Sequence, residues 1–187
     1  MRIVVALALA GLFSCAPQGD PAQETAAPPQ ALYDYDVEER IASLGVELTA
    51  PSPPVANYVN AVRTGNLVFM AGKGPSKPEG GYVTGRVGSD LTIEEGYDAA
   101  RLAAITQLSA LKAEIGDLNK VVRIVKVLGM VNAEPGFGNQ PEVINGFSDL
   151  IVEVFGDRGK HARAAVGMGS LPRDIAVEVE MIVEVQD

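Results

Sequence analysis

Tryptophan is absent from this chain of 187 residues, and the aromatic residues together make up only 5% of it. So few rings offer no platform on which nucleic-acid bases could stack. Basic residues are also scarce: 15 Lys and Arg stand against 24 Asp and Glu, which gives a net charge of -9. A chain of this charge repels phosphate backbones. The composition therefore disfavours nucleic acid as a principal partner.

Cysteine and histidine occur once each, as Cys15 and His161. One cysteine allows no disulfide within the chain, and one histidine forms no cluster with metal-ligand spacing. The glycine-rich residues 72–88 carry neither of the patterns that cradle nucleotide phosphates. No motif supports a serine–histidine nucleophile, so His161 is expected to be structural or at the surface. The sequence predicts no metal and no cofactor.

Long hydrophobic runs are missing too. The apolar run at residues 3–12 follows Arg2 and is too short to anchor a protein stably across a bilayer. It leads into Leu-Phe-Ser-Cys15, which resembles the lipobox of bacterial lipoproteins, where the cysteine is lipidated and becomes the mature N-terminus. We predict lipidation of Cys15 and stable membrane binding through the acyl groups. An ordinary secretory signal with a chance cysteine is the alternative.

No aspartate follows Cys15, which by resemblance to Gram-negative sorting favours export to the periplasmic face of the outer membrane. The next residues are rich in Ala, Pro, Gln and Gly and have no apolar periodicity, which is typical of a flexible tether. The chain is long enough for one domain with a substantial core. The expected parts are a signal peptide at 1–15, a tether at 16–33, an accessory helix with a proline-rich joint at 34–52, and the folded domain at 53–187.

Apolar periodicity and turn signals predict seven further elements in the folded part, after the short accessory helix. The clearest is a helix opened by a capping box of Thr92 and Glu95 and closed by Gly116. The expected elements are a helix at 36–44 with Asp36 as its N-cap, strands at 58–62 and 67–71 forming a hairpin, a helix at 93–115, a strand at 121–131, a helix at 141–155, and two final strands joined at 171–174.

This order predicts an α+β fold, with a mixed β-sheet and the two main helices on one face. A single layer of helices leaves the other face of the sheet to be covered. Oligomerisation is a common way for a small domain to cover such a face, so we expect more than one copy in the functional molecule.

The two final strands carry the residues most open to a functional interpretation. On the first, Arg163 stands among small residues such as Ala165 and Gly167, which predicts a hollow beside a group that binds carboxylates through a bidentate fork. On the second, Glu178 and Glu180 alternate with buried-type residues, and a solvated strand face explains them without function. The residues alone leave both interpretations open.

Three segments together resemble one known family. They are NYVNAVRTGNLVFMAGKGP at residues 57–75, ARA at 162–164 and LPRDIAVEVE at 171–180. Their order and spacing are similar to those of the Rid family (reactive intermediate deaminase, or YjgF-type), over about residues 53–187. Within that family the chain resembles the longer members with a chorismate-mutase-like fold.

The resemblance implies a homotrimer with three clefts at the subunit interfaces, in which amino-acid-derived enamines or imines are hydrolysed to 2-oxo acids and ammonia. It implies that Arg163 binds the substrate carboxylate and that Glu178 orients the attacking water. Tyr58 would line the pocket from the adjacent subunit and Asn145 would lie near the cleft. Lys73 stands where the family often has an amide and would also contact the substrate.

Two function classes follow from these observations. The first is a lipid-anchored enamine/imine deaminase, which needs neither metal nor cofactor because an imine carbon is already electrophilic. The second is a non-catalytic trimeric module that binds a small carboxylate through Arg163, with Glu178 purely structural. Ribonuclease activity, reported for some relatives of the family, fits the acidic charge poorly.

Overall fold

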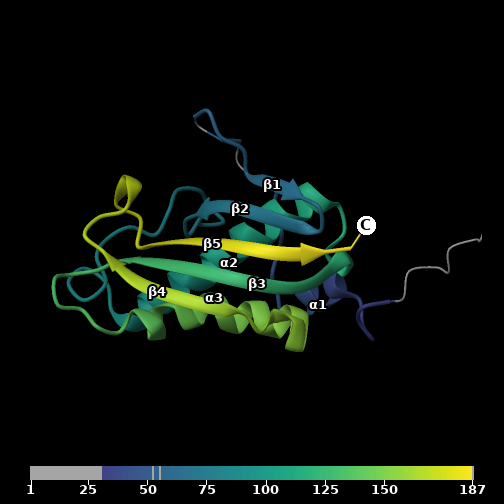
Figure 1. Cartoon of the computed structure of the whole chain (residues 1–187). Helices are drawn as coiled ribbons and strands as arrows, with labels where there is room; N and C mark the ends of the chain where they lie inside the picture. The colour runs from purple at the N-terminus through teal and green to yellow at the C-terminus, as the bar shows by residue number, and fades with distance from the viewer. Residues whose placement is uncertain (1–30, 52, 55, 187) are drawn as a thin grey trace, which may run out of the picture. The chain divides into compact units, whose positions relative to one another are not determined.

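The sheet in the computed structural model has five strands in the order β1-β2-β5-β3-β4 (Figure 1). The structure describes residues 31–51, 53–54 and 56–186, so Cys15 and nearly all of the predicted tether lie outside it. The elements are α1 Val37–Ser43, β1 Ala61–Thr64, β2 Leu67–Lys73, α2 Ile93–Ile115, β3 Val121–Asn132, α3 Gln140–Phe155, β4 Ala162–Met168 and β5 Val177–Val185, with short 3-10 turns at Leu118–Lys120, Gly156–Gly159 and Pro172–Asp174.

Helix α2 begins and ends where the sequence predicts. The Thr92 hydroxyl accepts a hydrogen bond from the Glu95 amide at 3.1 Å, and the Glu95 carboxylate accepts one from the Thr92 amide at 2.8 Å. At the other end Gly116 has φ 80°, a backbone conformation that glycine adopts without strain. The predicted capping box and C-terminal glycine are both confirmed.

Helices α2 and α3 cover one face of the sheet (Figure 1). They pack closely at Gly146, where an added Cβ would lie 2.0 Å from the Tyr97 carbonyl oxygen. The helices bury the sheet face beneath them. In strand β5, every second residue points toward the helices and is buried. These buried residues are Val177, Val179, Met181, Val183 and Val185. The predicted α+β architecture with helices on one face is confirmed.

The two final strands, predicted as consecutive strands joined at 171–174, do not pair with each other. Strand β3 lies between them, parallel to β4 and antiparallel to β5. Parallel neighbours need a crossover connection, and α3 provides it between β3 and β4. Strand β5 alternates more regularly between buried and exposed residues than β4 and takes a position inside the sheet, whereas the small residues of β4 form an edge.

Helix α1 is held at the C-terminal end of α3. The Asp36 carboxylate accepts hydrogen bonds from the amides of Glu38 and Glu39, as predicted for an N-cap. Arg40 Nε donates to the Glu153 carbonyl at 2.9 Å, so α1 leaves the first half of α3 free for other contacts. Among the helices of the described residues, none is long and apolar enough to cross a membrane.

Strand β1 begins later than the sequence predicts, at Ala61 and not at Tyr58. Its last residue, Thr64, pairs with Leu67, and Gly65 has φ 58° in the tight turn between them. Tyr58 therefore belongs to the segment that leads into the sheet. The hairpin itself is confirmed.

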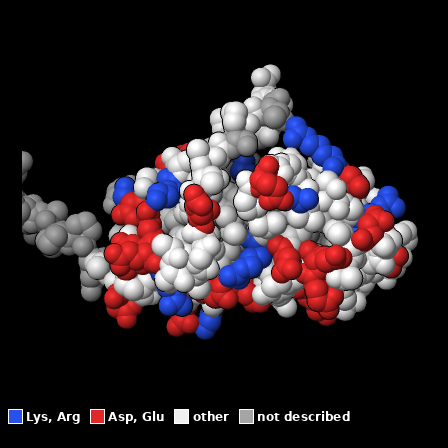
Figure 2. Space-filling model, turned by 180° about the vertical axis from the view of Figure 1, so that it is seen from behind, with Lys and Arg blue, Asp and Glu red and all other residues white. Residues whose placement is uncertain are grey.

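The other face of the sheet has no helix over it among the described residues. Large hydrophobic side chains stand exposed there or beside it, and we call this set of residues the open-face cluster. It consists of Tyr58, Val59, Val62, Phe69, Val166 and Met168. Figure 2 gives the opposite view, from the side of the helices, where acidic and basic side chains lie interspersed. The open-face cluster is thus on the side of the sheet opposite the helices.

Candidate functional site

Arg163 lies on edge strand β4, and its side chain extends over the first half of α3. Its Nη1 donates to Asn145 Oδ1 and to Ser148 Oγ, each at 2.9 Å, and its Nη2 donates to the Pro141 carbonyl at 3.3 Å. A guanidinium has five N–H groups, so two are left for a ligand carboxylate. The structure thus brings together two of the predicted site residues, Arg163 and Asn145.

The hollow predicted beside Arg163 is filled by helix α3. An added Cβ at Gly167 would lie 2.6 Å from Gln140 Nε2, and Ala165 packs against the core. The small residues of β4 therefore make room for α3, which holds the arginine from one side. The prediction of a hollow was wrong because the sequence does not show which element packs over this part of β4.

His161 and Ser148 form a second pair beside the arginine. His161 Nε2 lies 3.0 Å from Ser148 Oγ, and His161 Nδ1 lies 2.7 Å from the Gly159 carbonyl oxygen. Burial, and after it the charge of Arg163, lower the pKa of His161, although its bond to the Gly159 carbonyl opposes this. The ring is therefore neutral near neutral pH.

Neither His161 nor Ser148 was among the predicted site residues. A signal for them existed, because His161 directly precedes β4 and is two residues from Arg163, a spacing that puts both side chains on one face of an extended chain. Asn145 and Ser148 are three residues apart on one helix and share a face for the corresponding reason. Neither spacing says that the strand and the helix meet.

Glu178 lies on the other face of the sheet from Arg163. It pairs across the sheet with Met130, which pairs with Val166, an exposed residue of the open-face cluster. Arg163, in contrast, shares a row with Val127 and the buried Met181. Since cross-strand partners share a face, one chain does not bring the two predicted catalytic residues together.

The surroundings of Glu178 favour its neutral form. Its side chain occupies the space beside Gly72, where an added Cβ would lie 2.2 Å from Glu178 Oε1. Burial, and after it the charge of Glu180, raise the pKa of Glu178, while Lys73 opposes the rise. Burial in turn lowers the pKa of Lys73. A half-buried carboxyl with a raised pKa is suited to accept and return a proton near neutral pH.

A β-bulge in β2 makes this arrangement possible. The register of β2 against β5 shifts between Met70 and Lys73, and Gly72 lies within the shift. From helix α2, Gln107 Nε2 donates to the carbonyls of Ala71 at 2.9 Å and Val179 at 2.6 Å. Gln107 is fully buried, so a residue outside the predicted site holds the bulge beside Glu178.

Tyr58 and Lys73 lie in the same region as Glu178. Lys73 Nζ donates to Asn60 Oδ1 at 2.5 Å, and the Ala71 amide donates to the Asn60 carbonyl at 2.9 Å. Tyr58, two residues before Asn60, has 49% of its surface exposed. The predicted site residues therefore form two groups in one chain, one with Arg163 and Asn145 and one with Tyr58, Lys73 and Glu178.

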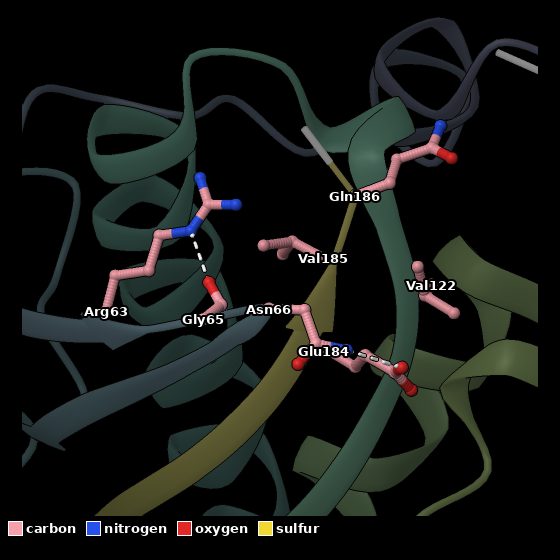
Figure 3. A pocket seen from close by; sticks show the side chains of 7 residues that line it. All are labelled: Arg63, Gly65, Asn66, Val122, Glu184, Val185 and Gln186. Atoms are coloured by element: carbon pink, nitrogen blue, oxygen red, sulfur yellow. Dashed lines mark hydrogen bonds between the residues drawn. The ribbon is translucent and has the colours of Figure 1, made fainter. Parts of the chain in front are cut away.

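Two surface hollows are formed by other residues. One, of about 330 Å³, lies on the open face and is lined by residues that include Phe69, Lys126 and Glu180. The other, of about 300 Å³, lies at the β1–β2 turn. In Figure 3 its polar groups bond to one another, with Arg63 Nε donating to the Gly65 carbonyl and Asn66 to Glu184. Neither hollow includes Arg163 or Glu178.

Within residues 31–186, apart from positions 52 and 55, no three His, Cys, Asp or Glu side chains gather as metal ligands.

Comparisons with known proteins agree with this fold. The family model described as "YjgF/chorismate_mutase-like, putative endoribonuclease" matches residues 38–185. Protein TCP17 of Trypanosoma cruzi is 43% identical over 152 residues, which cover 81% of this chain and 95% of that protein. The 2-iminobutanoate/2-iminopropanoate deaminase of Escherichia coli is 27% identical over 128 residues, which cover 68% of this chain and 87% of that enzyme.

The fold is also similar to that of a solved structure. The protein Atu1372 from Agrobacterium tumefaciens is 42% identical, with a TM-score of 0.75, and the match covers 80% of this chain and 92% of that one. The family match extends over every predicted site residue from Tyr58 to Glu178. The chain belongs to the YjgF/chorismate mutase-like family.

Proposed function

We propose that this protein is an enamine/imine deaminase that hydrolyses amino-acid-derived imines to 2-oxo acids and ammonia. The observation that carries the proposal is Arg163, held by α3 with two N–H groups left for a carboxylate. Membership of the family supports the reaction, because one relative is named as a deaminase of 2-iminobutanoate and 2-iminopropanoate.

The proposed reaction needs a cation, a proton acceptor and water. Arg163 binds the substrate carboxylate through a bidentate pair of hydrogen bonds. Glu178 takes a proton from water as the water oxygen forms a bond to the imine carbon, and returns it to the substrate nitrogen, which gives a tetrahedral adduct with a hydroxyl and an amino group. The adduct hydroxyl then loses its proton to Glu178, which passes it to the nitrogen as the C–N bond breaks, and ammonia and a 2-oxo acid leave. Glu178 ends in its original protonation state, and no redox step is involved.

Since Arg163 and Glu178 lie on opposite faces of one chain, the proposed site is completed by a second copy of the chain. The open-face cluster supports assembly, because such apolar surface is stabilised when another copy covers it. In a homotrimer each interface would join Arg163 and Asn145 of one subunit to Tyr58, Lys73 and Glu178 of the next.

The direct test supplies 2-aminoacrylate to the purified protein and follows release of ammonia. We expect turnover by wild type. For Arg163→Ala we expect a loss of about a hundredfold or more in kcat/KM, since the bidentate contact between the guanidinium and the substrate carboxylate is lost. Arg123→Ala is the matched control, because Arg123 is an exposed arginine of β3 that pairs with Glu184 at 3.5 Å. Equal rates for the two variants would contradict the role of Arg163.

A second candidate is the trimeric module that binds a small carboxylate without catalysis. The separation of Glu178 from Arg163 within one chain favours it, because the arginine alone is sufficient to bind a carboxylate. Binding of 2-oxobutanoate that Arg163→Ala abolishes, without any release of ammonia from imines, would support this candidate over the enzyme.

We also propose that the protein is exported and anchored by lipid on Cys15, on the periplasmic face of the outer membrane. The lipobox-like Leu-Phe-Ser-Cys15 supports this. Incorporation of labelled fatty acid into wild type, and its loss in Cys15→Ser, is the expected result. Equal labelling of both would contradict it.

A further inference from the structure

Three hydrogen bonds connect Arg163 to the backbone through Ser148 and His161, and while the imidazole is neutral each has one direction. The Gly159 carbonyl can only accept, so the proton of the neutral imidazole is on Nδ1, 2.7 Å away. His161 Nε2 then accepts from the Ser148 hydroxyl at 3.0 Å. Arg163 can only donate, so its Nη1 gives a hydrogen bond to Ser148 Oγ at 2.9 Å. We call this chain of bonds the Arg163 relay.

The packing of the histidine keeps the relay in this arrangement. The Phe147 ring meets the imidazole edge-to-face, with centroids 6.5 Å apart and planes at 82°. The neighbouring guanidinium, a fixed positive charge, disfavours a second cation on the ring. A protonated ring could not accept the serine hydrogen, so a neutral ring is what the relay requires.

We propose that Ser148 and His161 are positioning residues that hold the guanidinium of Arg163 ready for a ligand carboxylate. The proposal rests on the proposed role of Arg163 in carboxylate binding. An arginine on an exposed edge strand has many rotamers to lose, which costs affinity when it binds. Arg163 has already lost them, because α3 and the relay fix its terminal nitrogens on one side.

A serine–histidine pair also raises the alternative of a nucleophile. The geometry disfavours that role for Ser148, because Arg163 Nη1 lies 2.9 Å from Oγ and occupies a position that a reacting carbonyl carbon would need. The serine hydroxyl is used on both sides, as acceptor from Arg163 and as donor to His161. Holding the arginine is the role that uses both bonds.

The first experiment measures binding of 2-oxobutanoate to the full chain by calorimetry, so that no turnover is needed. Ser148→Ala and His161→Phe should each weaken binding about fivefold, as expected for one lost hydrogen bond. The double variant should bind no more weakly than Ser148→Ala, because His161 acts only through the serine. His161→Gln keeps an acceptor and should restore most of the affinity. Ser43→Ala, which removes a hydroxyl bonded within α1, is the control and should change nothing.

The second experiment is nuclear magnetic resonance of the imidazole nitrogens, which is unambiguous because the chain has one histidine. The relay predicts the neutral tautomer with its proton on Nδ1, and a shift of the Nε2 signal in Ser148→Ala. A proton on Nε2, or fully additive losses of affinity in the double variant, would overturn the proposal. If wild type does not bind 2-oxobutanoate, the role of Arg163 fails, and the imidazole signals decide separately whether the relay exists.

Discussion

Glu178 is a carboxyl in surroundings where ionisation is costly. Its side chain is partly buried beside Gly72, and Glu180 adds a like charge nearby, so its pKa is raised above the ordinary 4.5. A raised carboxyl pKa means that the folded state favours the protonated form, so this group contributes less to stability as the pH rises above that ordinary value. Such a residue is retained at the expense of stability, which is typical of a functional position.

We therefore expect Glu178→Gln to separate activity from stability. The variant should lose most of its ammonia release while its melting temperature at pH 7 stays equal to that of wild type or rises, since Gln does not ionise. The wild-type rate should increase with pH as Glu178 ionises, with the acid limb above pH 4.5. Rates and melting temperatures of both proteins check this. Unchanged turnover in Glu178→Gln would remove its role as proton acceptor.

At the scale of elements, the bulge in β2 and the buried amide of Gln107 act together. Gln107 satisfies the carbonyls of Ala71 and Val179, although its own Oε1 has no partner among the described residues. Burying a polar group stabilises a fold only when its bonds outweigh its desolvation. With two hydrogen bonds made and one oxygen left without a partner, Gln107 makes a small net contribution to the free energy of unfolding.

Gln107→Leu should lower the free energy of unfolding by about 1–2 kcal/mol, because two buried carbonyls lose their donor. The expected measurement is a urea titration, read as a lower midpoint with an unchanged slope. Thr106→Ala is the control, since its hydroxyl bonds to Leu102 within the same helix. If Gln107→Leu is more stable than wild type, the buried amide destabilises the fold and other contacts hold the bulge.

Most elements could be predicted from sequence, because their signals are local. Capping of α2 by Thr92 and the alternation of β5 are examples, and both were confirmed. Strand pairing could not be predicted in the same way, since β4 and β5 follow one another in the chain but are separated by β3. The relay of Ser148 and His161 was missed for the same reason, because it depends on α3 and β4 meeting in space.

At the scale of the whole molecule, one face of the sheet is covered by helices and the other carries the open-face cluster. Two of its members, Val62 and Phe69, pair directly across β1 and β2 and are 56% and 43% exposed. Apolar surface of this kind on a small acidic domain is most simply explained by assembly with further copies.

If the proposed trimer forms through this face, Phe69→Asp should reduce it to a monomer in light scattering, because a charge on the apolar face is left unpaired on association. Glu94→Lys is the control: it also alters charge, in the first turn of α2, on the helix side of the molecule. A wild-type monomer at micromolar concentration would contradict the shared site itself. A trimer that persists in Phe69→Asp would place the interface elsewhere.

The measurement that tests the central claim most directly is complementation between two inactive variants. Arg163→Ala and Glu178→Gln are each expected to release no ammonia from 2-aminoacrylate. When they are co-expressed in equal amounts and assemble at random into trimers, about a quarter of all interfaces should join an intact Arg163 to an intact Glu178. The account predicts recovery of about a quarter of wild-type activity. No recovery in verified mixed trimers would contradict it, because a site within one chain cannot be rebuilt by mixing.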